Sequence, residues 1–142
     1  MSGQRCSGVH RTQMQWIDTD ASGIYHNSTV IRLVEAAEAQ LMTARGVRGF
    51  TPCAPRAHYE VDFETPLVFG QAVETTVWLD RVGATSMGFS FEVWGEPYDD
   101  RLRRRAAFGR YVAVHVGADA DPGALSAVPW PAAWVEALTA PA

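Results

Sequence analysis

Two carboxylates and a glycine lie just ahead of a segment with helical periodicity, and together they could carry out acyl transfer. Residues 16–27 read WIDTDASGIYHN and contain Asp18, Asp20 and Gly23. A helix beginning after them would present unpaired N–H groups and about half a positive charge, which stabilise a carbonyl oxygen that gains negative charge. Either aspartate could attack that carbonyl or take a proton from an attacking water, and glycine lets a substrate approach the backbone. The segment therefore has the parts for acyl hydrolysis.

Both aspartates also have a purely structural interpretation. Asp18 and Asp20 could accept hydrogen bonds from N–H groups of the loop at 17–26 and take no part in chemistry. The residues alone leave open the choice between the two aspartates and between these two roles.

The helix that would position this loop spans residues 28–45, where apolar residues recur at helical spacing. Asn27 or Ser28 can cap its start, and Gly46 can end it. Ile31 and Met42 add apolar surface outside the main stripe, which indicates a helix covered on several sides. The main stripe consists of Val30, Leu33, Val34, Ala37, Leu41 and Ala44.

The apolar period changes to two after a loop at 47–56, and this period indicates strands with one buried face. Short turns at 83–84 and 95–100 require antiparallel neighbours. The predicted strands are 57–65, 71–82, 85–94 and 104–116, with a weaker one at 9–16. A strand, one long helix and four further strands predict an α+β fold in which an antiparallel sheet curls around the helix.

The 142 residues show no internal repeat and no linker, so we expect a single domain at 1–142. Its core should lie at about 9–116, followed by a tail at 117–142. We expect a loop at 117–129 and a short helix at 130–138 within that tail.

Composition excludes several classes of function. The net charge of −4 argues against nucleic acid as a partner, and no apolar run approaches the about 20 residues of a membrane helix. The N-terminus lacks the apolar region of a secretory signal, so we expect a cytoplasmic protein. Cys6 and Cys53 are expected to be free thiols in a reducing compartment. The histidines have no metal-ligand spacing, so no metal is predicted; they are His10, His26, His58 and His115.

Two other motifs have competing interpretations. Residues 83–88 read GATSMG, but the spacing differs from that of a nucleophile elbow and the segment lies between two strands, so we predict a hairpin turn. An arginine cluster could bind phosphate groups, or it could be the solvated face of a hairpin. The cluster comprises Arg101, Arg103, Arg104 and Arg105, with Arg81 and Arg110 on neighbouring strands.

Residues 16–38, WIDTDASGIYHNSTVIRLVEAAE, resemble the hotdog-fold acyl-CoA thioesterases of the 4-hydroxybenzoyl-CoA type. That family carries D-x-D-x-x-G, an aromatic or histidine stretch, and then R-x-x-E-A-A on the helix. Weaker matches at 61–70 and 82–86 extend the resemblance over about residues 9–116. The resemblance implies a hotdog fold, and it implies that Asp20 is the catalytic nucleophile or general base while Asp18 is structural. It also implies that Gly23 and the N–H groups from Ile24 onward polarise the thioester carbonyl.

The resemblance further implies which residues meet the substrate. Tyr25, His26 and Asn27 would bind it. The phosphate chemistry of arginine, and not the resemblance, makes Arg103 and Arg104 candidates to contact the phosphates of coenzyme A. Many relatives have histidine four residues after the glycine, whereas His26 lies three after it, so the roles of His26 and Asn27 stay open. Some hotdog enzymes use a helix glutamate instead of the aspartate, which makes the helix residues Glu35 and Glu38 lesser catalytic candidates.

The expected activity is hydrolysis of an acyl-CoA or acyl-carrier-protein thioester. The resemblance implies an active site at the interface of a homodimer or homotetramer, and coenzyme A would enter only as part of the substrate, with no bound cofactor. One alternative is an acyl-CoA dehydratase that uses His26 with Glu35. The other is a non-catalytic protein that binds acyl-CoA or serves as a scaffold.

Overall fold

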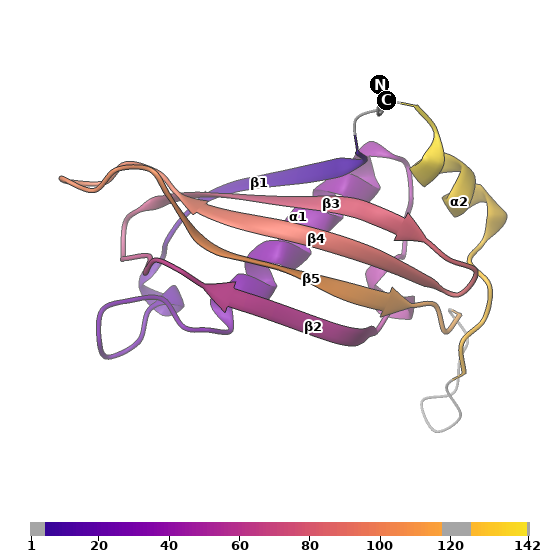
Figure 1. Cartoon of the computed structure of the whole chain (residues 1–142), viewed down its shortest axis with the longest axis horizontal. Coiled ribbons are helices and arrows are strands. Elements are labelled where there is room, and N and C mark those ends of the chain that lie inside the picture. Colours follow the sequence, from indigo (N-terminus) through magenta and orange to yellow (C-terminus); the bar gives the residue numbers. More distant parts are fainter. Residues whose placement is uncertain (1–4, 118–125, 142) are drawn as a thin grey trace.

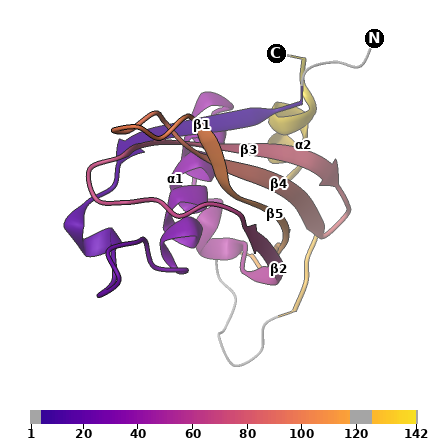
Figure 2. The same cartoon turned by 60° about the vertical axis from the view of Figure 1, so that its left-hand side comes forward.

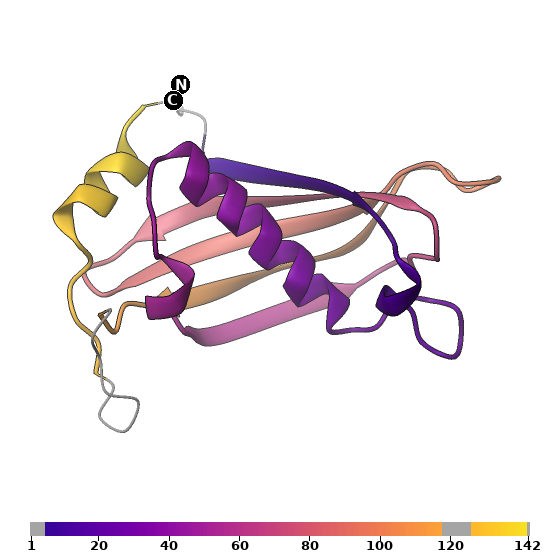
Figure 3. The same cartoon turned by 180° about the vertical axis from the view of Figure 1, so that it is seen from behind.

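One antiparallel sheet and one long helix make up most of the structure, a computed structural model that describes residues 5–117 and 126–141. The strand order in the sheet is β1-β3-β4-β5-β2, and α1 crosses one face of it (Figure 1; Figure 3). The strands are β1 (Ser7–Gln13), β2 (Arg56–Phe63), β3 (Ala72–Val82), β4 (Ser86–Gly95) and β5 (Arg104–Val114). The helices are η1 (Trp16–Asp18), α1 (Thr29–Ala44), η2 (Thr51–Cys53) and α2 (Ala132–Thr139). This arrangement confirms the predicted α+β hotdog fold.

Strict alternation along the central strands separates a face that packs on the helix from an outer face. In β4, Met87, Phe89, Phe91 and Val93 are buried, and the residues between them are partly exposed. Gly83 N–H donates to the carbonyl of Ser86 at 2.7 Å, which closes the turn between β3 and β4. The prediction of a hairpin turn at 83–88 is therefore confirmed.

Helix α1 begins and ends within one residue of the prediction. Gly46 follows the last turn with a positive φ of 71°, and Val47 N–H donates to Met42 O at 2.9 Å, so the predicted glycine stop is confirmed. Ser28 occupies the N-cap position, but its side chain makes no capping hydrogen bond. Of the two apolar residues outside the main stripe, Met42 is buried and Ile31 is 41% exposed, so the expectation of a helix covered on several sides fails only at Ile31. The sheet packs against α1 through β1, β3 and β4, and the helix face turned away from the sheet is open (Figure 3).

Strand β1 lies close against α1 because it carries Gly8 at the contact. A Cβ atom at Gly8 would lie 2.3 Å from the carbonyl oxygen of Ala37 and 2.5 Å from the backbone nitrogen of Leu41. Strand β1 also ends earlier than predicted, at Gln13. The backbone N–H of Gln15 donates to the Asp18 carboxylate at 2.8 Å, which turns the chain into η1 instead of continuing the strand.

The C-terminal helix α2 packs beside an aromatic cluster at one end of the sheet. Phe50 and His115 both stack on Trp130, with ring centroids 5.3 and 4.9 Å apart. The predicted helix at 130–138 is confirmed as α2, whereas part of the predicted loop at 117–129 lies outside the described residues. Cys6 and Cys53 are buried free thiols. No helix in the described ranges has the length and apolar character needed to cross a bilayer.

Candidate active site

The loop between β1 and α1 projects beyond the end of the sheet (Figure 1; Figure 2). It holds Asp20 at a tight turn. Gly23 N–H donates to Asp20 O at 3.0 Å, and Asp20 N–H donates to Ile24 O at 2.9 Å. Aspartate at the first turn position and glycine at the fourth are typical of such turns. Gly23 has a φ of 84°, which favours glycine, and no atom lies within 4 Å of the position that its Cβ would take. The turn therefore leaves Asp20 exposed beside an open backbone segment.

Ser22 holds the Asp20 carboxylate. Both the backbone N–H and the hydroxyl of Ser22 donate to Asp20 Oδ1, the first at 2.8 Å. The hydroxyl bond is the main cause that lowers the pKa of Asp20 below its ordinary value, the backbone bond adds to it, and the charge of His26 contributes less. Asp20 is therefore an exposed carboxylate at neutral pH.

Asp18 lies on the opposite side of the loop from solvent and ties the loop to the helix. It is buried, accepts from Gln15 N–H at 2.8 Å and forms an ion pair with Arg32 on α1. Its backbone carbonyl accepts from His26 N–H at 2.8 Å and from the Thr29 hydroxyl at 3.1 Å. The carboxylate and the backbone carbonyl of Asp18 are therefore hydrogen-bonded or ion-paired within the protein, as expected of a residue with a structural role.

Some backbone N–H groups of the loop donate hydrogen bonds within the protein, and others are free. Tyr25 N–H donates to Leu67 O at 3.0 Å, while Gly23 and His26 N–H are occupied as described above. Within the described part of the chain, the N–H groups of Ile24 and Asn27 donate to no acceptor. Two free donors therefore lie in the segment that leads from Asp20 to the first turn of α1.

An open pocket of about 230 Å³ adjoins this segment. Ile24, Tyr25 and Asn27 form one wall, and the end of β2 with the residues after it, 63–66, forms the other. The rings of Tyr25 and Phe63 lie 6.2 Å apart, and Phe63 is 48% exposed. Phe63 lies in the strand predicted at 57–65 and is not among the site residues predicted from the sequence. The alternation in β2 could not show that the sheet stops covering this position.

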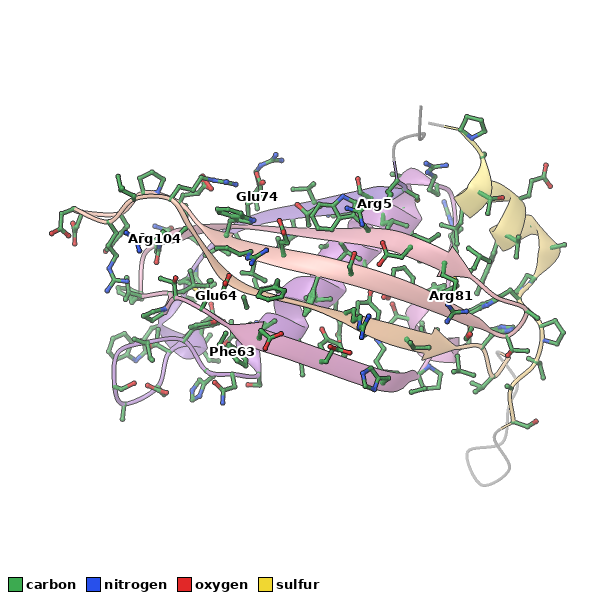
Figure 4. The ribbon with its side chains drawn as sticks, in the orientation of Figure 1. Arg5, Phe63, Glu64, Glu74, Arg81 and Arg104 are labelled. Carbon is green, nitrogen blue, oxygen red and sulfur yellow. The ribbon has the colours of Figure 1, made fainter. Side chains whose placement is uncertain are left out.

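The arginine cluster divides into occupied and free members. Arg103 pairs with Glu96 at 2.5 Å and Glu74 at 3.3 Å, and its guanidinium lies 4.6 Å from the centre of the Trp94 ring. Arg104 has no ion-pair partner among the described residues. It lies at the base of the β4–β5 hairpin, at the same end of the molecule as Phe63 (Figure 4).

Arg104 and Arg101 line a second open pocket of about 410 Å³. Thr65 and Pro66 belong to the walls of both pockets. The space beside the Asp20 loop therefore continues towards two arginines.

The remaining candidates are not brought into this site. Glu35 is exposed on α1, and no hydrogen bond joins it to His26 in the described ranges. Glu38 is fully buried on the face of α1 that packs on the sheet. It accepts hydrogen bonds from Tyr111, from Arg56 at 2.7 Å and from Thr51 at 3.2 Å. No cluster of three or more metal-ligating side chains is found where the structure describes the chain.

The five-stranded antiparallel sheet packed on α1 is the hotdog fold. The loop with Asp20 at the start of α1 forms an open site at one end of it. The model of the thioesterase superfamily matches residues 22–99, which is more than half of the chain. The chain therefore belongs to the thioesterase superfamily, and the family predicted from the sequence is confirmed. No curated protein matches the chain.

Solved structures share this fold at low identity. The 4-hydroxybenzoyl-CoA thioesterase from Pseudomonas sp. strain CBS-3 is 15% identical, with a TM-score of 0.81 and coverage of 94% of this chain and 99% of that one. A 1,4-dihydroxy-2-naphthoyl-CoA thioesterase from Synechocystis is also 15% identical, with a TM-score of 0.76 and coverage of 93% and 95%. A thioesterase from Thermus thermophilus, complexed with coenzyme A and zinc, is 21% identical, with a TM-score of 0.77 and coverage of 92% and 90%.

Proposed function

We propose that the protein hydrolyses acyl-CoA thioesters and that Asp20 is the carboxylate that acts on the thioester carbonyl. The observation that carries this proposal is the exposed Asp20 carboxylate, held by Ser22 beside the free N–H groups of Ile24 and Asn27. A carboxylate and free donors at a helix start are the groups that acyl hydrolysis needs.

The reaction balances by either of two routes. As a nucleophile, Asp20 bonds to the carbonyl carbon, the C–S bond breaks, the thiolate takes a proton from water, and water hydrolyses the mixed anhydride. As a general base, Asp20 takes a proton from the attacking water and passes it to the departing thiolate. In both routes the Ile24 or Asn27 N–H group stabilises the carbonyl oxygen as it gains charge. Rapid quenching followed by mass spectrometry of the protein distinguishes the routes, since only the first leaves an acyl group on Asp20.

The positions of the two pockets suit a coenzyme A thioester without any bound cofactor. The acyl group would enter the pocket beside Tyr25, and the phosphates would lie towards Arg104 and Arg101. Arg103 is a weaker phosphate ligand than Arg104 because Glu74 and Glu96 already neutralise it. The three neighbouring structures described above are thioesterases, which agrees with this substrate class.

We propose that two or more copies of the chain form the complete site. Asp20 and Phe63 are exposed, so the single chain does not exclude water from the carbonyl that reacts. β2 is an edge strand that pairs only with β5, and Phe63 lies at its end. A second copy that covers this edge would enclose the pocket. Light scattering after size exclusion measures the oligomer, with a dimer or tetramer expected.

The test of the activity is thiol release from short, long, branched and aromatic acyl-CoAs, compared with the same acyl groups on a carrier protein. Release of thiol from at least one acyl-CoA supports the proposal. Hydration of an enoyl-CoA without thiol release would instead indicate a dehydratase. Binding of acyl-CoA with no reaction of either kind would indicate a non-catalytic protein.

A further inference from the structure

Strand β2 forms one edge of the sheet, and half of its backbone groups face away from β5. Glu64 N–H donates to Ala106 O at 2.8 Å, in the register that β2 keeps with β5. Because backbone groups in an antiparallel ladder alternate between the two sides of a strand, the even-numbered residues at 58–64 point theirs towards β5. The odd-numbered residues at 59–63 therefore point their N–H and C=O groups outward, where no strand of the described chain lies beside them. Such a row of free groups is a template for a further strand.

The apolar face of β2 is also partly open in the single chain. Helix α1 packs on β1, β3 and β4 and covers β2 only in part. On this face of β2, Phe63 is exposed, and Tyr59 and Val61 are half-buried. The other edge strand, β1, has α1 so close against it that a Cβ atom at Gly8 would collide with the helix backbone. A second copy of the chain therefore buries more apolar surface at β2 than at β1.

The outer face of β2 carries one basic and two acidic side chains in a fixed order, His58, Glu60 and Asp62. The Nε2 atom of His58 lies 3.0 Å from Oε1 of Glu60, and Arg110 on β5 donates to the same oxygen at 2.8 Å. Asp62 is exposed and makes no ion pair with any residue that the structure describes. Because the order is not symmetric, each way of pairing this strand with a copy of itself brings different charges together.

These charges distinguish the possible registers of such a pair. Two copies related by a two-fold axis pair their β2 strands antiparallel, with one residue of each strand on the axis, opposite itself. An axis at Glu60 or at Asp62 opposes two identical acids, and an axis at Val61 opposes Glu60 to the partner's Asp62. An axis at His58 opposes two histidines. Like charges directly opposite each other destabilise a strand pair. An axis at Tyr59 opposes no two acids and places His58 opposite the partner's Glu60 twice.

We propose that β2 pairs with the β2 strand of a second copy with Tyr59 on the two-fold axis, so that His58 faces the partner's Glu60 at two symmetric places. The inference deepens the assembly proposed above, to which it adds the register and the residues that fix it. It rests on that assembly and not on the thioesterase activity.

This register brings the partner to the pocket beside Tyr25. Val61 lies opposite the partner's Ala57, and Phe63 lies next to the partner's segment 55–57, where the register of β2 with β5 shifts. The exposed ring of Phe63 is one wall of the pocket. The partner's segment 55–57 therefore contributes to the open side of the site.

Cysteine cross-linking tests the register directly. Position 58 of one copy faces position 60 of the other with Cα atoms about 4.5 Å apart, which a disulfide can bridge. Positions on the diagonal lie about 7–8 Å apart, beyond that reach. An oxidised equimolar mixture of His58→Cys and Glu60→Cys should therefore give a cross-linked dimer that mass spectrometry identifies as one copy of each variant. Each variant oxidised alone should stay uncross-linked, as should the wild type, whose Cys6 and Cys53 are buried.

The other outcomes separate the register from the assembly. A cross-link in Glu60→Cys alone puts Glu60 on the axis and refutes the register. A mixture that stays uncross-linked, although light scattering shows a dimer, refutes it as well. A protein that is monomeric in solution overturns both the assembly and its register. None of these measurements uses thiol release, so failure of the thioesterase proposal is a separate result.

A charge substitution tests the same pairing without a covalent link. His58→Glu opposes two glutamates at both symmetric places, so the dissociation constant of the dimer should rise by about tenfold in sedimentation equilibrium. Ser7→Glu is the matched control, because it adds the same charge to an exposed position on β1 and should leave the dissociation constant unchanged. Equal dissociation constants for the wild type and His58→Glu would overturn the proposal.

Discussion

The ion pair between Asp18 and Arg32 should couple the stability of the loop to that of α1, and a double-mutant cycle measures this coupling. The Asp18 side chain is 7% exposed, whereas that of Arg32 is 60% exposed. Arg32→Met therefore leaves a buried carboxylate with only Gln15 N–H as a partner. Asp18→Asn leaves an arginine that water can reach, and the amide oxygen still accepts from Gln15.

The difference in exposure between Asp18 and Arg32 determines how much unfolding free energy each substitution should cost. Breaking a buried pair by removing one partner costs about 3–5 kcal/mol, and water access at the exposed Arg32 reduces this to about 2 kcal/mol for Arg32→Met. Asp18→Asn should cost about 1–2 kcal/mol through the lost charged hydrogen bond. Arg32→Met added to Asp18→Asn should cost under about 0.5 kcal/mol, because no buried charge remains to be stranded. The expected coupling is therefore about 1.5 kcal/mol.

Urea unfolding of the wild type, the two single variants and the double variant gives these free energies, provided that the slopes agree. Arg48→Met is the control, because Arg48 is exposed and has no ion pair within the described residues, so it should change the stability by about 0.5 kcal/mol at most. Additivity of the two single variants within about 0.5 kcal/mol would refute the coupling.

Three further predictions concern the loop, the core and the second pocket. Ser22→Ala should raise the pKa of Asp20 towards its ordinary 3.8, so the loss of kcat/KM on acidification should begin at higher pH; an unchanged acid limb contradicts this. Tyr111→Phe should cost about 1–3 kcal/mol in urea unfolding, because Glu38 loses a buried donor; a cost below about 0.5 kcal/mol contradicts this. Arg104→Gln should raise KM for acyl-CoA but not for the acyl-pantetheine, and equal effects on both would exclude a phosphate contact.

The fold was predictable because the periodicity of the apolar residues and the order of the helix and strands exclude most other folds. The alternation in β4 and the helical stripe of α1 each survive in the structure with shifts of about one residue. The prediction failed where a side chain overrides the pattern, as when Asp18 captures Gln15 N–H and ends β1 early. It also failed at Ile31, because an apolar residue on a helix does not show which side the sheet occupies.

The site was predictable only in its local part. Asp20, Gly23 and Ile24 lie within one turn, so the motif and the turn describe the same residues. The pocket requires Phe63 to meet Tyr25, which lies far from it in sequence and meets it only after folding. The difference between Arg103 and Arg104 likewise depends on cross-strand partners, since Glu74 lies on β3. The spacing of residues along the chain does not indicate which side chains meet after folding.

The most direct test of the account is thiol release by Asp20→Asn, measured beside acyl-CoA binding and urea unfolding of the same variant. An Asp-to-Asn variant of the neighbouring 4-hydroxybenzoyl-CoA thioesterase has been solved with 4-hydroxybenzoyl-CoA, so a substitution of this kind is compatible with ligand binding in that protein. Asp20→Asn should lower kcat by about 100-fold or more while acyl-CoA binding and stability stay close to those of the wild type. Hydrolysis at the wild-type rate by a folded Asp20→Asn variant would contradict it.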